Sequence, residues 1–348
     1  MEWSGNMGKP MLSALVTFYN QKDYVDIAMK SIMMQKTNFE FEVLVGDDGS
    51  DDGTVEKINQ WIKRYPEQIK LYVMPRDKDK EYFGSFRFCQ NRLNLLNHVT
   101  GKYFAFLDGD DYYTADYKFQ KQVDILENPK NDDCIACAHD IEKVYPDGKR
   151  KRLCAGRLKE RKIDIEEFWK NYYLSAENFI VRSNVISKIP QELLNNTFED
   201  IIQTFFVLQY GKLYYIPEVM AAYVQTGEGL WTAGDRASNC ISNLIRYDIA
   251  IKINPSMKKI TDKKFAAIWR QAYCKRKQFS PDKFPIFYQE AKEKKLTSTL
   301  QWLQYNKISR TEKLELFVQT FTRYNFGRYK YQLLQWIINK KGTVNESE

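Results

Sequence analysis

The 348-residue sequence contains few cysteines, only two histidines and no long apolar run. Because no stretch of 18 apolar residues occurs, the sequence predicts no transmembrane helix. The six cysteines are scattered, and Cys134 and Cys137 form the only close pair. No second Cys or His pair with metal-ligand spacing accompanies them. We therefore favour packing in a buried strand, with a redox or zinc role as the alternative.

The first ten residues also lack the apolar core of a secretory signal peptide. We therefore expect a cytoplasmic protein. The apolar fraction of 43% and the aromatic fraction of 15% are those of a globular protein that buries a sizeable core.

Positive charge is distributed unevenly along the chain. The net charge is +8, but residues 236–348 hold 23 Lys and Arg against 9 Asp and Glu, whereas the first 235 residues are net acidic. Gly227, Gly229 and Gly234 interrupt the pattern just before this change. We infer a domain boundary near residues 227–236.

Short apolar segments alternate with segments of helical periodicity through the first 107 residues. Strands that alternate with helices in this way are expected to form a parallel, three-layer α/β sheet with right-handed crossovers. Predicted strands cover residues 12–18, 41–45, 69–74 and 103–107, and predicted helices cover residues 23–34, 55–65 and 86–99.

Two acidic turns, residues 46–54 and 108–111, follow the second and fourth of these strands. Asp108 and Asp110 are two residues apart, so they point the same way in an extended chain, and Gly109 lets a ligand approach the backbone. Carboxylates suit Mg²⁺ or Mn²⁺, and such a metal is commonly shared with substrate phosphates. A single acidic turn is often only a solvated loop. Two of them at the carboxyl ends of parallel strands indicate one nucleotide site.

Three segments resemble glycosyltransferase family 2: residues 17–20 (Thr-Phe-Tyr-Asn), residues 45–54, and residues 101–111, which end in Leu-Asp-Gly-Asp-Asp. The resemblance covers about residues 11–226. It implies the GT-A fold, in which a three-layer α/β/α nucleotide-binding sheet is continuous with an acceptor-binding half, here followed by an α-helical C-terminal region. It also implies inverting transfer of a sugar from a nucleotide-sugar, usually with Mn²⁺ or Mg²⁺, and with uridine as the customary base.

The resemblance and the charge pattern together predict how the chain is divided. The expected segments are an N-terminal extension (1–10), a catalytic domain (11–234) with a nucleotide-sugar-binding half (11–115) and an acceptor half (116–234), a basic helical region (235–341) and a disordered tail (342–348).

The resemblance also assigns nucleotide and metal roles. Asp48 would hydrogen-bond the base, Asp108 would touch ribose or sugar hydroxyls, and Asp110 would ligate the metal on the diphosphate. Arg92 matches the basic residue that the family often places in the helix before the fourth strand. The other residues expected to border the nucleotide are Thr17, Phe18 and Tyr19.

Glu199 and Asp200 form an acidic pair at the start of a predicted helix that runs to Tyr210. The helix dipole favours acids in a first turn, so helix chemistry alone would explain them. The resemblance instead implies that Asp200 is the catalytic base and that Glu199 orients the base or an acceptor sugar. Asp200 would take the proton of an acceptor hydroxyl while its oxygen attacks the anomeric carbon.

Further candidates concern the acceptor site and a lid. Glu177 and Asn178 lie where the family forms the floor of the acceptor site. Gly229 would permit a lid and Trp231 could stack on a sugar face, although an ordinary glycine-rich linker explains both equally well. A lone histidine such as His139, which follows a predicted strand, is usually structural, with contact to the acceptor or a metal as the alternative.

The C-terminal region shows basic amphipathic helices, which suggest an anionic partner such as the inner face of the cell membrane or a lipid-linked acceptor. The alternative is a helical lobe that packs on the catalytic domain and has a solvated basic face. We expect no nucleic-acid partner, because no recognition motif occurs. The sequence leaves a homo-oligomer open.

We therefore expect an inverting, metal-dependent glycosyltransferase. It would move a sugar from a nucleoside-diphosphate sugar, with UDP as the expected carrier, to a hydroxyl of a glycan or lipid-linked acceptor in capsule or other surface polysaccharide biosynthesis. A non-catalytic nucleotide- or glycan-binding protein with the same fold is the alternative, because the lid segment lacks the His or Arg of many relatives. A nucleotidyltransferase is a third hypothesis, although the chain lacks the glycine-rich basic N-terminal loop expected of one.

Overall fold

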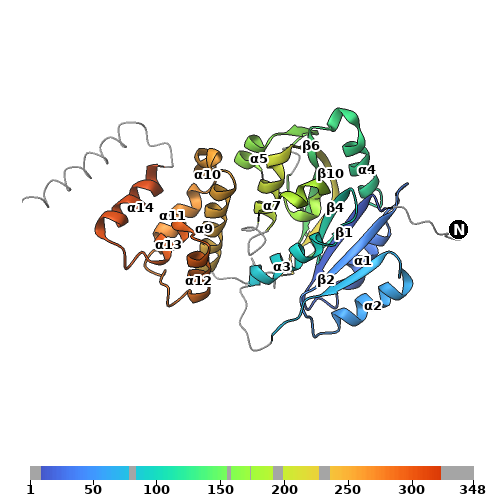
Figure 1. Cartoon of the computed structure of the whole chain (residues 1–348), viewed down its shortest axis with the longest axis horizontal. Coiled ribbons are helices and arrows are strands. Elements are labelled where there is room, and N and C mark those ends of the chain that lie inside the picture. The colour runs from blue at the N-terminus through green and yellow to red at the C-terminus, as the bar shows by residue number, and fades with distance from the viewer. Residues whose placement is uncertain are drawn as a thin grey trace, which may run out of the picture. The chain divides into compact units, whose positions relative to one another are not determined.

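A computed structural model describes residues 9–77, 84–154, 158–172, 174–190, 199–226 and 236–322 (Figure 1). The chain divides into two compact units, residues 1–233 and residues 234–348. Each unit is described by itself below.

Strands and helices alternate through the first half of the first unit, as the apolar pattern predicted. The order is β1 (Leu12–Phe18), α1 (Val25–Met33), β2 (Phe41–Asp47), α2 (Thr54–Arg64), β3 (Ile69–Val73), α3 (Gly84–Leu96) and β4 (Tyr103–Asp108).

The second half of this unit is richer in strands. It contains β5 (Tyr112–Tyr113), α4 (Lys118–Glu127), β6 (Cys134–Val144), β7 (Arg150–Arg152), β8 (Arg161–Ile163), α5 (Ile165–Asn171), β9 (Phe179–Arg182), α7 (Asp200–Val207) and β10 (Lys212–Val224). A 3₁₀ turn, Ala176–Asn178, precedes β9.

The described strands form one sheet in the order β3-β2-β1-β4-β9-β6-β10-β5, with β7 beside β6 and β8 beside β10. Strands β3, β2, β1 and β4 are parallel, whereas β9 is antiparallel to both β4 and β6. The parallel arrangement predicted for the first four strands is therefore confirmed, and the antiparallel pairs of β9 make the sheet as a whole mixed.

Register in the parallel part places the ends of the strands together. Thr17 on β1 lies opposite both Gly46 on β2 and Asp108 on β4. Phe18 lies opposite Asp47. The loops that follow β1, β2 and β4 therefore leave the sheet at the same edge, where ligands bind in open α/β sheets.

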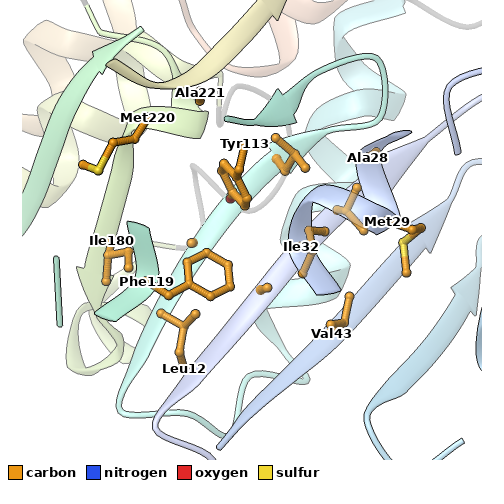
Figure 2. Packing of buried hydrophobic residues seen from close by; sticks show 14 of the residues in the cluster. Leu12, Ala28, Met29, Ile32, Val43, Tyr113, Phe119, Ile180, Met220 and Ala221 are labelled. Atoms are coloured by element: carbon orange, nitrogen blue, oxygen red, sulfur yellow. The ribbon is translucent and has the colours of Figure 1, made fainter. Parts of the chain in front are cut away.

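Alternate residues of the central strands pack against helices on one face of the sheet. Leu12 and Val43 lie on this face (Figure 2), and Ala28, Met29 and Ile32 of α1 belong to the same apolar cluster. The cluster continues to Phe119 of α4. The other face is covered by α3, which contacts β1 and β2. Helices thus cover both faces, and this gives the three layers.

Cys134 and Cys137 on β6 are buried members of the same apolar cluster, and both are free thiols. Burial raises the pKa of Cys134 to about 11, so this thiol stays protonated at neutral pH. Both observations agree with the packing role favoured from the sequence.

The second unit is helical. Trp269 and Trp302 are fully buried at its centre, with their rings edge to face at 5.8 Å. Asp248 caps a helix by accepting the main-chain N–H groups of Ser298 at 3.1 Å and Thr299 at 2.8 Å. The described helices are α9 (Arg236–Ile253), α10 (Lys258–Lys264), α11 (Ala266–Lys275), α12 (Pro285–Glu293), α13 (Thr297–Leu303) and α14 (Arg310–Thr322).

Within the described ranges, no helix combines the length and the apolar character needed to span a membrane.

The turn before β4 leaves no room for a side chain at Gly101. A Cβ there would lie 2.7 Å from the main-chain nitrogen of Ser13 and 2.8 Å from the carbonyl oxygen of Tyr103. We expect Gly101→Ala to lower the free energy of unfolding by about 1–3 kcal/mol in urea denaturation, because backbone atoms must shift.

Gly148 provides the control for this substitution. It has a φ of +80°, and a Cβ there would meet nothing within 4 Å. Gly148→Asn should change the free energy of unfolding by less than about 0.5 kcal/mol, because Asn tolerates the left-handed region. A Gly101→Ala variant as stable as the wild type would contradict the close approach.

Candidate functional site

The acidic turn after β2 is built around Asp47. Its buried carboxylate accepts the main-chain N–H groups of Gly49 at 2.9 Å and Ser50 at 2.8 Å. The Ser50 hydroxyl in turn accepts the main-chain N–H of Asn20, and the Asn20 side chain accepts that of Asp51. The loops after β1 and β2 are therefore joined, and Asp47 serves the turn itself.

Asp48, the next residue, points to a different set of partners. Its carboxylate accepts hydrogen bonds from Arg76 at 2.8 Å and from Arg87 Nε at 2.6 Å. The Arg76 guanidinium lies over the ring of Tyr19, 4.0 Å from the ring centroid. Burial raises the pKa of Asp48, although Arg87 and Arg76 oppose the shift. A carboxylate, two guanidinium groups and a half-exposed aromatic ring thus converge at the end of β2.

Thr17 and Phe18 support the end of β4. The Thr17 carbonyl accepts the main-chain N–H of Gly109 at 2.9 Å, and the Thr17 hydroxyl bonds to Asp108. Phe18 is buried in the core, and a Cβ on Gly109 would lie 2.3 Å from its ring. Any larger residue at 109 would therefore displace the Phe18 ring and the turn that carries the acidic residues.

Arg92 on α3 joins two carboxylates that are distant in sequence. Its guanidinium donates to Asp108 at 2.6 Å and to Asp200 through a second, short hydrogen bond. Asp108 ends β4, and Asp200 is the first residue of α7, whose N-cap is Glu199. The side chain of Arg92 is fully buried, whereas Asp108 and Asp200 are 22% and 19% exposed. The structure therefore places the predicted base and the predicted sugar-binding acid on one guanidinium.

Asp110 lies beside this ion-pair group. Burial and the charge of Asp108 raise the pKa of Asp110 to about 6. Within the part of the chain that the structure describes, no group of three or more His, Cys, Asp or Glu side chains is arranged to hold a metal by itself. The protein can therefore offer one or two carboxylate ligands here, which is how Mg²⁺ is usually bound when substrate phosphates complete its shell.

Glu177 and Asn178, the predicted acceptor-floor residues, are both buried. Ser175 donates to Glu177 at 2.6 Å and to the Asn178 side chain at 3.1 Å. Burial, together with the charges of Asp200 and Asp108, raises the pKa of Glu177 to about 8. Glu177 therefore belongs to the same electrostatic cluster as the two acids that Arg92 holds.

His139 is fully buried and has no exposed surface in this conformation. Its Nδ1 lies 2.6 Å from the carbonyl oxygen of Asp140, and burial lowers its pKa well below the ordinary value. Lys118 is buried as well, 4.4 Å from the centroid of the Tyr113 ring, and burial lowers its pKa to about 7. Nothing in these positions supports contact between His139 and an acceptor.

The sequence interpretation missed Arg76, Arg87 and Lys118. Arg76 and Arg87 could have been found from the sequence, because three arginines occur between residues 76 and 92, close to two acidic turns. The burial of Lys118 could not have been predicted, because the sequence around it is typical of the start of an ordinary helix. Two predicted lid residues, Gly229 and Trp231, lie outside the described residues.

Comparisons with known proteins bear on the first unit. A family model described as Glycosyl transferase family 2 matches residues 13–189, which are more than half of the chain. An uncharacterized protein of Mycobacterium tuberculosis is 25% identical over 229 residues, covering 63% of this chain and 60% of that relative, so the match spans less than two thirds of its length. TuaG of Bacillus subtilis, a putative teichuronic acid biosynthesis glycosyltransferase, is 30% identical over 118 residues, covering 34% of this chain and 42% of TuaG.

Solved structures share the fold. The structure of residues 1–349 of S. aureus TarS in complex with UDP-GlcNAc aligns with a TM-score of 0.59 at 13% sequence identity. The alignment covers 90% of this chain and 89% of that chain. This likeness confirms the GT-A type of fold.

The raised pKa of Asp110 predicts how its removal changes stability. The folded-state value of about 6 lies above the ordinary 3.8, so the folded chain holds this proton more tightly than the unfolded chain does. Protonated Asp110 therefore makes its full contribution to the free energy of unfolding of the wild type below about pH 4, and this contribution is lost as the pH rises through 6. We expect Asp110→Asn to match the wild type at pH 4 and to exceed its free energy of unfolding by about 1–2 kcal/mol at pH 8.

Asp133 provides a control of opposite sign in the same pH series. Hydrogen bonds from Lys162 and Lys212 lower the pKa of Asp133 to about 2. Asp133→Asn should therefore be less stable than the wild type at pH 8, with the difference shrinking as the pH falls below 4. The difference in free energy of unfolding between variant and wild type should change with pH in opposite directions for the two variants. A change in the same direction would contradict this account of Asp110.

Proposed function

The chain belongs to glycosyl transferase family 2 and is a glycosyltransferase, and we propose that it transfers a sugar with inversion from a nucleoside-diphosphate sugar to an acceptor hydroxyl. The observation that carries the proposal is the convergence of Asp48, Asp108, Asp110 and Asp200 at the carboxyl ends of β2 and β4 and the start of α7. Residues 11–234 would form the catalytic domain.

We propose that Asp48 reads the nucleobase. An ionised carboxylate accepts hydrogen bonds but cannot donate them. Uracil and guanine present a ring N–H at the edge that pairs with other bases, whereas cytosine and adenine present a lone pair there. Asp48 therefore favours a uridine or guanosine carrier, and the UDP-GlcNAc complex of the structural neighbour TarS favours uridine. Tyr19, whose ring lies under the Arg76 guanidinium, is 42% exposed and would border the base.

A divalent cation fits the acidic group at the end of β4. Asp110 would hold Mn²⁺ or Mg²⁺, with the diphosphate and water completing the shell, because the described residues supply too few ligands to bind the ion alone. When bound, the ion would stabilise the negative charge that develops on the leaving diphosphate. Burial raises the pKa of two neighbouring acids, Asp108 and Asp110. The positive charge of the cation would offset this effect and favour their ionised forms.

The chemical step would use Asp200 as general base. The Asp200 carboxylate takes the proton of the acceptor hydroxyl while that oxygen attacks the anomeric carbon. The bond from the anomeric carbon to the diphosphate oxygen breaks on the opposite side, so the configuration inverts. General-base catalysis of this kind contributes roughly 10²–10⁴-fold. Glu199, which is buried at the N-cap of α7, would help to hold Asp200 in place.

The acceptor is proposed by class. The similarity to TuaG favours a role in surface polysaccharide biosynthesis, with a glycan or a lipid-linked sugar as acceptor. We propose that the basic C-terminal helices bring the enzyme to an anionic partner, either the lipid-linked acceptor or the inner face of the cell membrane.

Removal of the proposed base should separate chemistry from binding. We expect Asp200→Asn to lower kcat by about 10²–10⁴-fold while the Kd for nucleotide changes by less than about threefold. The assay is transfer or slow hydrolysis of a panel of UDP- and GDP-sugars with Mn²⁺, and proton NMR of the product gives the anomeric configuration. An unchanged kcat would exclude Asp200 as base. A wild type inactive with every sugar would favour the non-catalytic alternative.

Donor binding should depend on the metal and on Asp110. A ligand at one hundred times its Kd stabilises the folded state by about 2.7 kcal/mol, which corresponds to a rise in Tm of about 5–10 °C for a domain of this size. We expect UDP with Mn²⁺ to produce such a rise in the wild type and almost none in Asp110→Ala.

Asp116→Ala serves as the matched control for the loss of a carboxylate. Asp116 pairs with Lys36 at 2.6 Å and lies outside the acidic group. This variant should keep the full response to UDP and Mn²⁺. A response to UDP that is independent of Mn²⁺, or one that survives in Asp110→Ala, would contradict the proposed metal site.

A further inference from the structure

Arg92 is a charged group of the site that is completely buried. Its side chain has no exposed surface and lies close to the rings of Phe88 and Phe106, whose centroids are 4.2 Å and 5.1 Å from the guanidinium carbon. A buried cation of this kind is stable only when it is paired. Arg92 satisfies this requirement through Asp108 at the end of β4 and Asp200 at the start of α7.

The two ion pairs use the planar shape of the guanidinium. Nη2 donates to Asp108 Oδ1 and Nη1 donates to Asp200 Oδ1, so the two carboxylates are held at a separation fixed by one rigid group. The rings of Phe88 and Phe106, which contact the guanidinium, limit the tilt of that group. The carboxylate of Asp200 is therefore oriented by a residue on α3, 108 positions earlier in the sequence.

The contact leaves Asp200 available for chemistry. One oxygen of its carboxylate, Oδ1, is bound to Arg92. The side chain retains 19% exposure. Arg92 itself has no exposed surface, whereas the two carboxylates that it holds are partly exposed.

We propose that Arg92 is a positioning residue that sets the orientation of Asp200 and couples it to the occupancy of Asp108 by the donor. The inference rests on the proposed function, in which Asp200 is the base. A shift of about 1 Å in a catalytic group can cost about 10²-fold in rate, so loss of this anchor should appear mainly in kcat. A purely structural ion pair would instead lower stability without a specific link to Asp200.

A double-mutant cycle on kcat distinguishes these two roles. The variants are Arg92→Met, Asp200→Asn and their combination, assayed with the UDP- or GDP-sugar that the wild type turns over fastest. We expect Arg92→Met to lower kcat by about 10²-fold in the wild-type background and by less than about threefold when Asp200→Asn is already present. Effects on kcat that multiply in the double variant would overturn the proposal.

Arg92→Lys and an arginine outside the site complete the design. Lysine keeps the charge but lacks the rigid planar fork that fixes the separation of two carboxylates, so Arg92→Lys should retain an intermediate kcat and a folded protein even if Arg92→Met unfolds. Arg182 donates to the carbonyls of Cys134 and Leu126 and to the Tyr103 hydroxyl. Arg182→Met should lower Tm but change kcat by less than about threefold.

The outcomes separate this inference from the proposed function. A fully active Asp200→Asn, or no turnover of any sugar by the wild type, would contradict the proposed function and the inference with it. An inactive Asp200→Asn together with wild-type kcat in both Arg92 variants would overturn the inference alone. Equal losses of kcat in Arg92→Lys and Arg182→Met would indicate a structural role for both arginines.

Discussion

A guanidinium group with no exposed surface requires negative charge around it, and this requirement ties α3 to the ends of two other elements. Arg92 meets this requirement through Asp108, at the end of β4, and Asp200, at the start of α7. The pairing joins the acidic turn after β4 and the start of α7 in one site. Without it, burial of either carboxylate would be costly and the approach of α7 to β4 would lose its anchor.

The site carries more acid than its cations can neutralise. Burial and mutual repulsion raise the pKa values of Asp108, Asp110 and Glu177, and a diphosphate alone would add further negative charge. The proposed divalent cation would resolve this conflict, because it would offset the charge of both the acids and the diphosphate. Burial of these acids is unfavourable for the stability of the folded protein, and such unfavourable burial is typical of a functional site. It is consistent with a site that binds a metal–nucleotide complex.

Much of the fold could be predicted because local patterns determine it. The order from β1 to β4 follows from alternating apolar segments, and Asp108 and Asp110 were identified because they directly follow a buried strand. Distant pairings could not be predicted in the same way. Antiparallel β9, the contact of Arg92 with Asp200 and the two arginines on Asp48 depend on tertiary approach.

The central claim is that the carboxyl ends of β2 and β4 form one metal–nucleotide site. Anomalous diffraction at the manganese edge, from crystals grown with UDP and Mn²⁺, tests it most directly. The account predicts one manganese peak within coordination distance of the Asp110 carboxylate, with the diphosphate on the same ion and uracil beside Asp48. Manganese bound away from Asp110, or a nucleotide away from these strand ends, would contradict it.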